Sequence, residues 1–284
     1  MHPFAITTDS GADLPQSYCE AHEILVLPLP VTMNGEVYET MDVKEFYRQL
    51  RAGAMPTTSA ANLEDTCRLF RQVLSTGSDL LHIAFSSGLS SSCDTAFLAA
   101  KEMETEFPDR KILVVDSLSA SLGQGFLVNY GVKCRERGLT LEETHRVLEA
   151  IKGKVVHDFT VDDLHHLHRG GRVSKTTAVM GSLMNIKPML HVDKEGHLVA
   201  LGKVRGRKAA IGALVESMAR QGEEFNQEEV FISHGDCLED ALTLQSMVEE
   251  RFGIHNFLVA PIGPTIGTHS GPGTLALFFL GRPR

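Results

Sequence analysis

Residues 80–116, which read LLHIAFSSGLSSSCDTAFLAAKEMETEFPDRKILVVD, decide the fold class. The apolar run at 80–85 predicts a buried strand, and the apolar run at 112–116 predicts a second one. The intervening spacing of apolar residues favours a helix over 92–107. A strand, a helix and a second strand in this order form a parallel β-α-β unit.

The same alternation continues on both sides of this unit and predicts an α/β protein. We expect strands at 5–8 and 24–29 and helices at 43–52, 63–74, 122–137 and 141–152. The first half of the chain should therefore be a three-layer α/β/α domain with a parallel sheet. Binding sites in such sheets form at the carboxyl ends of the strands.

The second half of the chain predicts a different kind of sheet. Strands are expected at 155–161, 186–192, 197–203, 229–234 and 256–261, with helices at 162–168, 207–221 and 238–252. The turn Lys194-Glu195-Gly196 lies between two strand patterns and predicts an antiparallel hairpin. We therefore expect a Rossmann-like domain at 1–155 and a mixed-sheet α/β domain at 156–284.

Composition excludes several classes of function. The chain has 284 residues, of which 43% are hydrophobic, and this length suggests two domains. A net charge of −9 argues against a general nucleic-acid-binding surface. The cysteines are odd in number, scattered and never in a CxxC pair, which favours free thiols in a reducing cytoplasm over disulfides or a zinc site. They are Cys19, Cys67, Cys93, Cys134 and Cys237.

An uncharged run at 252–281 is long enough to cross a bilayer but is a poor spanning helix. Pro261, Pro264 and Pro272 lie within it among several glycines, so a helix would be broken in lipid. Two short strands joined by a glycine-rich turn fit the run better. The early Asp9 and Asp13 also argue against a secretory signal.

Three turns rich in hydroxyl groups or glycine are candidate anion sites. The threonine loop (residues 56–62) contains Thr58 and ends at Asn62, an expected helix N-cap. The serine loop (residues 85–92) joins a strand to a helix, where free N–H and O–H groups can face an anion. The glycine-rich segment 263–273 contains His269 among hydroxyl residues. For each turn, a purely structural capping role is the alternative.

Two further clusters allow more than one interpretation. His165 and His168 are three residues apart on an expected helix, but this spacing lacks the i, i+4 pairing of zinc helices, so solvated histidines are favoured over a metal site. Lys203, Arg205, Arg207 and Lys208 form the strong basic cluster. On a strand the first three share one face, which is either simply solvated or docks an acidic partner or a phosphate.

Taken in order along nearly the whole chain, these motifs resemble the DegV family of bacterial fatty-acid-binding proteins. Each motif is weak alone, but the ordered set is specific. The motifs are TDSGADLP at 8–15, TTS at 57–59, SSGLS at 86–90, VVDS at 114–117, GGRVS at 170–174, KP at 187–188, the basic cluster at 203–208 and the segment 263–273.

The resemblance implies a DegV-like fold with a long-chain fatty acid buried between its domains and no other cofactor or metal. The carboxylate-binding residues implied are Thr58, Ser59, Ser90 and His269. Supporting residues would be Ser87, Gly88, Arg172, Gly267 and Thr268. The chain departs from the family pattern at 60–62 and 91–93, but the hydroxyl positions are kept.

The resemblance also implies a partner. Members of the family supply a bound fatty acid to a separate fatty acid kinase, which phosphorylates its carboxylate for lipid synthesis. The chain would then be a lipid carrier without catalytic residues, with docking through Lys203, Arg205 and Arg207. No nucleic acid and no transmembrane segment are expected, and membrane contact would be transient.

Two other functions compete with this interpretation. The DegV fold is similar to the substrate-binding part of dihydroxyacetone kinases, which would make the chain a phosphotransferase subunit with a nucleophilic histidine. Alternatively, Ser90 and His269 could act as a serine acyl hydrolase. The chain has neither a P-loop after the serine loop nor a GxSxG elbow.

Overall fold

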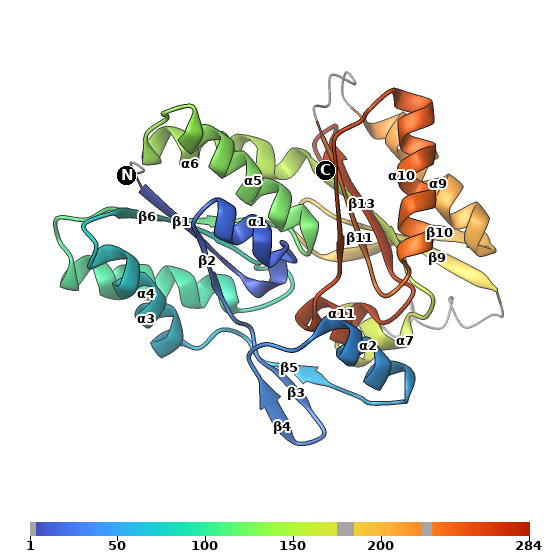
Figure 1. Ribbon diagram of the computed structural model, residues 1–284, viewed down its shortest axis with the longest axis horizontal. Coiled ribbons are helices and arrows are strands. Elements are labelled where there is room, and N and C mark those ends of the chain that lie inside the picture. Colours follow the sequence, from blue (N-terminus) through green and yellow to red (C-terminus); the bar gives the residue numbers. More distant parts are fainter. Residues whose placement is uncertain (1–3, 175–184, 223–228) are drawn as a thin grey trace.

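The computed structural model describes residues 4–174, 185–222 and 229–284, whose strands form three sheets (Figure 1). The first is fully parallel, in the order β2-β1-β6-β7. Its strands are β1 (Phe4–Asp9), β2 (Ile24–Leu27), β6 (Asp79–Ala84) and β7 (Ile112–Asp116). The parallel sheet expected from residues 80–116 is confirmed.

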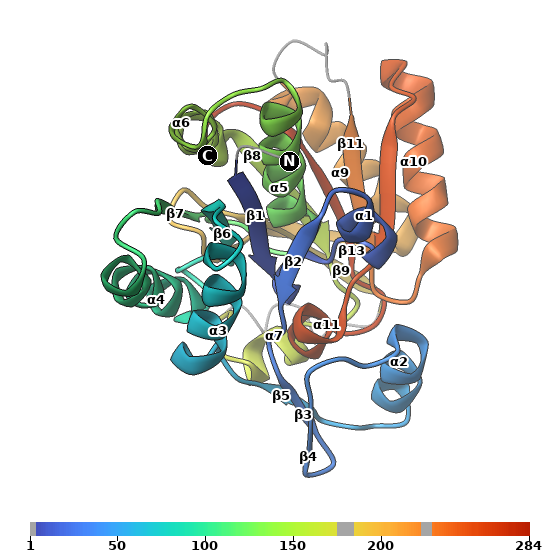
Figure 2. The same cartoon turned by 60° about the vertical axis from the view of Figure 1, so that its left-hand side comes forward.

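Helices cover both faces of this parallel sheet (Figure 2). On β6, Leu80 and Ala84 pack in one apolar cluster with α3 (Leu63–Leu74) and α4 (Ser92–Glu106). Leu81 and Ile83 point the other way, into the cluster of α5 (Leu122–Glu136) and α6 (Leu141–Ile151). Side chains alternate along a strand, so this apolar run serves two helical layers.

The second sheet is mixed, in the order β10-β9-β8-β13-β11-β12. Neighbouring strands are antiparallel except for the parallel pair β11 and β12. The helices α9 (Arg207–Gln221) and α10 (Leu238–Phe252) cover one face, and α5 contacts the other (Figure 1). The strands are β8 (Val155–Thr160), β9 (Ile186–Val192), β10 (Leu198–Arg205), β11 (Val230–His234), β12 (Phe257–Pro261) and β13 (Leu275–Leu280).

The third sheet is small and was not predicted. It contains β3 (Val31–Met33), β4 (Glu36–Tyr38) and β5 (Thr57–Thr58), and α2 (Val43–Arg51) packs against it. Asn34 and Gly35 join β3 to β4 with φ of 54° and 84°, as a two-residue hairpin requires. The Asn-Gly pair was therefore an available signal. The first half of the chain also contains α1 (Gln16–Ala21).

The expected glycine-rich turn at 263–273 is wrong, because this segment contains the helix α11 (Pro264–Ser270). Pro264 occupies the first turn, where its missing N–H costs nothing. Gly267 weakens the helix but is required, since an added Cβ would lie 2.7 Å from the Phe46 ring. The flanking strands β12 and β13 are not neighbours, because β11 lies between them.

The other boundaries differ from expectation by small amounts. The expected helix at 162–168 starts later, as α7 (His165–Arg169), and short 3₁₀ turns lie at Ser10–Ala12 and Lys152–Lys154. All strands of the parallel sheet precede residue 155, and all strands of the mixed sheet lie at or after it. The division into two domains at this residue stays a prediction. No helix in the described residues is long and apolar enough to cross a membrane. All five cysteines are free.

Asn62 caps α3 as expected, because its Oδ1 accepts a hydrogen bond from Asp65 N at 2.8 Å. We predict that Asn62→Ala lowers the free energy of unfolding by about 1 kcal/mol, since the helix loses this acceptor. Asn62→Ser should lose only a few tenths of that, because serine is also a good N-cap. Urea unfolding measures both, and equal stability of Asn62→Ala and wild type would contradict the capping role.

Candidate functional site

A cavity lies between the loops of the parallel sheet and the inner face of the mixed sheet. About 970 Å³ within it is not filled by protein atoms, and part of this space is open to solvent. Most of its lining is apolar. The larger apolar side chains include Leu29, Phe85, Phe159, Ile262, Ile266 and Phe278.

The mixed sheet forms one wall of the cavity through strand alternation. His157 and Phe159 of β8 lie on the same face, and the register places Phe278 and Ala276 of β13 beside them. All four line the cavity. The wall runs along β13 from Thr274, close to the end of α11, to Phe278, a distance of about 14 Å at 3.4 Å per residue. The apolar wall therefore leads away from α11.

The polar end of the cavity joins the three turns singled out in the sequence. Thr58 on β5 and His269 on α11 form a hydrogen bond of 2.7 Å between Oγ1 and Nε2. In the serine loop, Ser90 Oγ lies 2.9 Å from Ser92 Oγ, which accepts a hydrogen bond from Ala61 N of the threonine loop at 3.0 Å. The structure thus brings Thr58, Ser90 and His269 to one cavity. Ser59 also lines it.

His269 is held in a neutral form. Burial, and then the positive charges of Arg172 and Arg169, lower its pKa to about 4. Its Nδ1 has no hydrogen-bond partner among the described residues and packs against Gly170, where an added Cβ would lie only 2.1 Å away. The imidazole is therefore neutral at physiological pH, and its position depends on a glycine.

Arg172 lies on the cavity wall and supports the serine loop. Its Nη2 and Nε donate to the carbonyl oxygen of Leu89 at 3.0 and 3.2 Å. Burial lowers the pKa of its guanidinium. Gly171 precedes it with φ of 75° after the end of α7, a left-handed conformation that favours glycine. The segment after α7 is thereby tied to the loop that carries Ser90.

Four of the supporting residues implied by the resemblance lie outside the cavity lining, and their supporting role stays a prediction. Ser87 is exposed and its Oγ donates to Asp116 at 2.5 Å. Thr268 donates to Pro264 O within α11 at 2.8 Å. The glycines Gly88 and Gly267 are each packed closely against other segments. Their contacts are structural, and Arg172 alone of the five supporting residues lines the cavity.

The basic cluster is divided by the end of β10. Lys203 and Arg205 are exposed on this edge strand and form no ion pair within the described residues. Arg207, however, begins α9 instead of continuing the strand. Its Nε lies 2.8 Å from Asp240 Oδ2 and its Nη1 donates to Gly273 O at 2.8 Å. The expected shared face of three cations is wrong, because Gly206 (φ 88°) turns the chain.

Ser90 and His269 are not hydrogen-bonded to each other, as the nucleophile and base of a serine hydrolase would be. Ser90 bonds to Ser92, and His269 bonds to Thr58. A hydrolytic serine needs its base within hydrogen-bond reach and a third group to orient that base. In the described residues the histidine lacks such a group at Nδ1.

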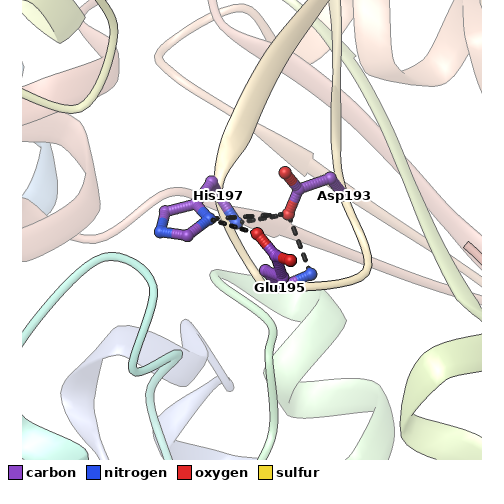
Figure 3. Close-up of side chains that lie close together, drawn as sticks. All are labelled: Asp193, Glu195 and His197. Carbon is purple, nitrogen blue, oxygen red and sulfur yellow. Dashed lines mark hydrogen bonds and ion pairs between the residues drawn. The ribbon is translucent and has the colours of Figure 1, made fainter.

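His165 and His168 do not belong to a metal-ligand cluster in the described portion of the chain. The one cluster of ligand atoms found there consists of Asp193, Glu195 and His197, in the turn between β9 and β10 (Figure 3). This turn is exposed or half-buried, and Asp193 Oδ1 already accepts the N–H groups of Glu195 and His197 at 2.9 Å. These bonds explain the clustering as turn geometry.

Several cavity residues were missed in the sequence. Ser121 and Ser233 line the cavity and form a 3.0 Å hydrogen bond, and Thr265 also lines it. Ser121 has φ of 54° and donates to Asp13 Oδ2 at 2.5 Å, which holds this unusual backbone conformation. No spacing in the sequence links these residues. The expected strand at 155–161 could have indicated, by alternation, that His157 and Phe159 share a face.

Comparison with known proteins agrees with this fold. The model of the DegV family, described as uncharacterised, matches residues 3–282. A DegV domain-containing protein of Clostridium perfringens is 41% identical over 99% of this chain and 98% of its own length. Another from Lactococcus lactis is 40% identical, with 98% of each chain covered.

Two solved structures with the same fold are described as fatty-acid-binding proteins. A fatty-acid-binding DegV family protein from Thermus thermophilus has a TM-score of 0.87 and 31% identity, covering 99% of this chain and all of its own. DegV from Bacillus subtilis, described as a fatty acid binding protein, has a TM-score of 0.87 and 30% identity with the same coverage.

Proposed function

Since this chain belongs to the DegV family, we propose that it binds a long-chain fatty acid in the cavity, with the carboxylate at Thr58, Ser90 and His269. The observation that carries the proposal is a largely apolar cavity whose lining includes the hydrogen-bonded pair Thr58 and His269 and the hydroxyl of Ser90. The related structures described as fatty-acid-binding proteins support the same ligand.

The chemistry of the polar end suits a buried carboxylate. A carboxylate is costly to bury unless several donors satisfy it. If the neutral His269 donates its Nε2 proton to Thr58 Oγ1, the threonine hydroxyl proton remains available for the ligand. Ser90 supplies another hydroxyl and Ser59 lies beside them. The tail contributes about 0.8 kcal/mol for each buried CH₂, so an apolar wall is sufficient to retain it.

The chain is proposed to act as a carrier that presents the carboxylate to a separate fatty acid kinase. In this role the cavity residues bind and orient the ligand. The kinase binds ATP and provides the catalytic groups. A reducing compartment such as the cytoplasm fits the five free cysteines. The exposed Lys203 and Arg205 are the proposed contact with an acidic surface of the kinase.

Titration with palmitic acid and with its methyl ester tests the proposed ligand and its orientation. The ester keeps the apolar tail but removes the anionic head group. We expect the acid to bind at least about tenfold more tightly than the ester, because the hydroxyl donors lose a charged acceptor. Equal binding of both ligands, or binding of neither, would contradict the proposal.

Charge reversal at Arg205 tests the docking surface. Arg205→Glu should slow association with a purified fatty acid kinase, most strongly at low salt, and leave the bound lipid in place. Lys101→Glu on α4 is the matched control, because Lys101 is also an exposed cation. A pull-down run beside lipid extraction measures both effects. Loss of lipid with unchanged kinase affinity would show that Arg205 serves the cavity instead.

A further inference from the structure

We propose that the turn between β9 and β10, residues 193–197, is a latch that controls how fast the ligand enters and leaves the cavity. This hairpin latch rests on the proposed binding of a fatty acid and adds a conformational device to it. The turn belongs to the mixed sheet, but it packs against the serine loop, which follows β6 of the parallel sheet. It therefore connects the two larger sheets across the cavity.

The contact between the latch and the serine loop is close on both sides. Ser86 Oγ donates to the carbonyl oxygen of Gly196 at 3.0 Å, and Ser86 is fully buried. An added Cβ on Gly88 would lie 2.6 Å from Glu195 O and 2.8 Å from Gly196 C. From the other side, an added Cβ on Gly196 would lie 2.1 Å from Ser86 Oγ. Two glycines thus allow two backbones to meet.

This contact closes one side of the cavity. Val192 and Leu198, which flank the latch, both line the cavity. Phe85 and Leu89, which flank the contacting residues of the serine loop, line it as well. Separation of the latch from the serine loop would therefore open a gap in the cavity wall.

The latch is built to move as a unit. Asp193 N donates to His197 O at 2.9 Å, and Gly196 N donates to Asp193 O at 3.0 Å. The side chains of Asp193, Glu195 and His197 gather at the tip (Figure 3). The pairing of β9 with β8 ends at His191, and β10 is an edge strand, so the tip extends beyond the paired region of the sheet. The turn can swing away without losing its internal hydrogen bonds.

Exchange kinetics of a fluorescent fatty acid test the latch. Protein loaded with cis-parinaric acid is mixed with excess albumin, and stopped-flow fluorescence gives the release rate. The variants are Gly88→Ala and Gly196→Ala, which widen the contact from opposite sides, and Ser86→Ala, which removes the hydrogen bond. Gly202→Ala is the control on the same hairpin, because nothing lies within 4 Å of its added Cβ.

Release should be about tenfold faster in each glycine variant, because the added methyl group overpacks the contact. Gly196 has φ of 81°, so alanine there also strains the turn, and Gly88→Ala is the variant that tests overpacking alone. Ser86→Ala should release about fivefold faster, because the bond from Ser86 Oγ to Gly196 O is lost together with the bond that Gly88 N donates to Ser86 Oγ. Uptake should also be faster and the Kd should change less than the rates, because the open state is favoured with and without ligand. Gly202→Ala should behave as wild type.

The outcomes separate the latch from the proposed function. Wild type that fails to bind cis-parinaric acid and palmitate would overturn fatty acid binding itself. Wild type that binds, with release rates in Gly88→Ala, Gly196→Ala and Ser86→Ala all within about twofold of it, would overturn the latch alone. A large rise in Kd without faster release would also refute the latch, since it would assign the contact to head-group binding. Ser86→Ala keeps the test decisive if either glycine variant fails to fold.

Discussion

Replacing Thr58, Ser90 or His269 with alanine is expected to weaken palmitate binding by about 1–3 kcal/mol each. Thr58→Ala and Ser90→Ala remove a hydroxyl donor of the buried carboxylate, and His269→Ala removes the group that orients the Thr58 hydroxyl. A double replacement should lose more than either single one. Thr58 and His269 are hydrogen-bonded to each other, so their combined loss should be smaller than the sum of the two. A competition titration with palmitate measures the affinity of the three single variants and the double variant relative to wild type.

Two neighbouring residues provide matched controls for these variants. Thr57→Ala changes the adjacent residue of β5, which does not line the cavity. Ser87→Ala changes a serine of the same loop that bonds to Asp116. Both controls should bind palmitate as wild type does. If all three head-group variants also bind as wild type, the carboxylate lies elsewhere in the fold.

Gly170→Ala is expected to weaken palmitate binding about as much as His269→Ala, although the histidine is retained. An added Cβ would lie 2.1 Å from His269 Nδ1 and 2.9 Å from Cε1, so the imidazole must shift, which disturbs its hydrogen bond with Thr58. Gly170 has φ of −73°, so alanine causes no backbone strain at this position. The same titration measures the effect.

Gly153→Ala is the control for this prediction, because nothing lies within 4 Å of its added Cβ. Urea unfolding of both variants separates loss of binding from loss of stability. Wild-type affinity in a folded Gly170→Ala protein would show that the orientation of His269 does not determine head-group binding.

Much of the fold was predictable because its strands and helices repeat simple patterns. The bounds of α3, β7, β9, α9 and α10 agree with those expected. The small sheet was missed because its strands are short, although Asn34-Gly35 indicated a hairpin. The helix α11 was missed because Gly267 and Gly271 suggested a turn. Packing against Phe46 and Tyr47 overrides that preference.

The site was less predictable than the fold. Hydroxyl groups and a histidine near turns indicated an anion site, but only the resemblance to a family connected Thr58, Ser90 and His269, which are far apart in the chain. The structure places these three in one cavity and excludes Ser87 from its lining. Arg207 could not be separated from Lys203 and Arg205 by charge alone, because its partners Asp162 and Asp240 come from distant segments.

Native mass spectrometry of the purified protein, followed by denaturing extraction, tests fatty acid binding most directly. We predict a mass increase that corresponds to one bound fatty acid, the same species in the extract, and a smaller amount of this species with the Thr58→Ala/His269→Ala double variant. Repeated ligand-free preparations that also fail to take up added palmitate, oleate or stearate would contradict the central claim.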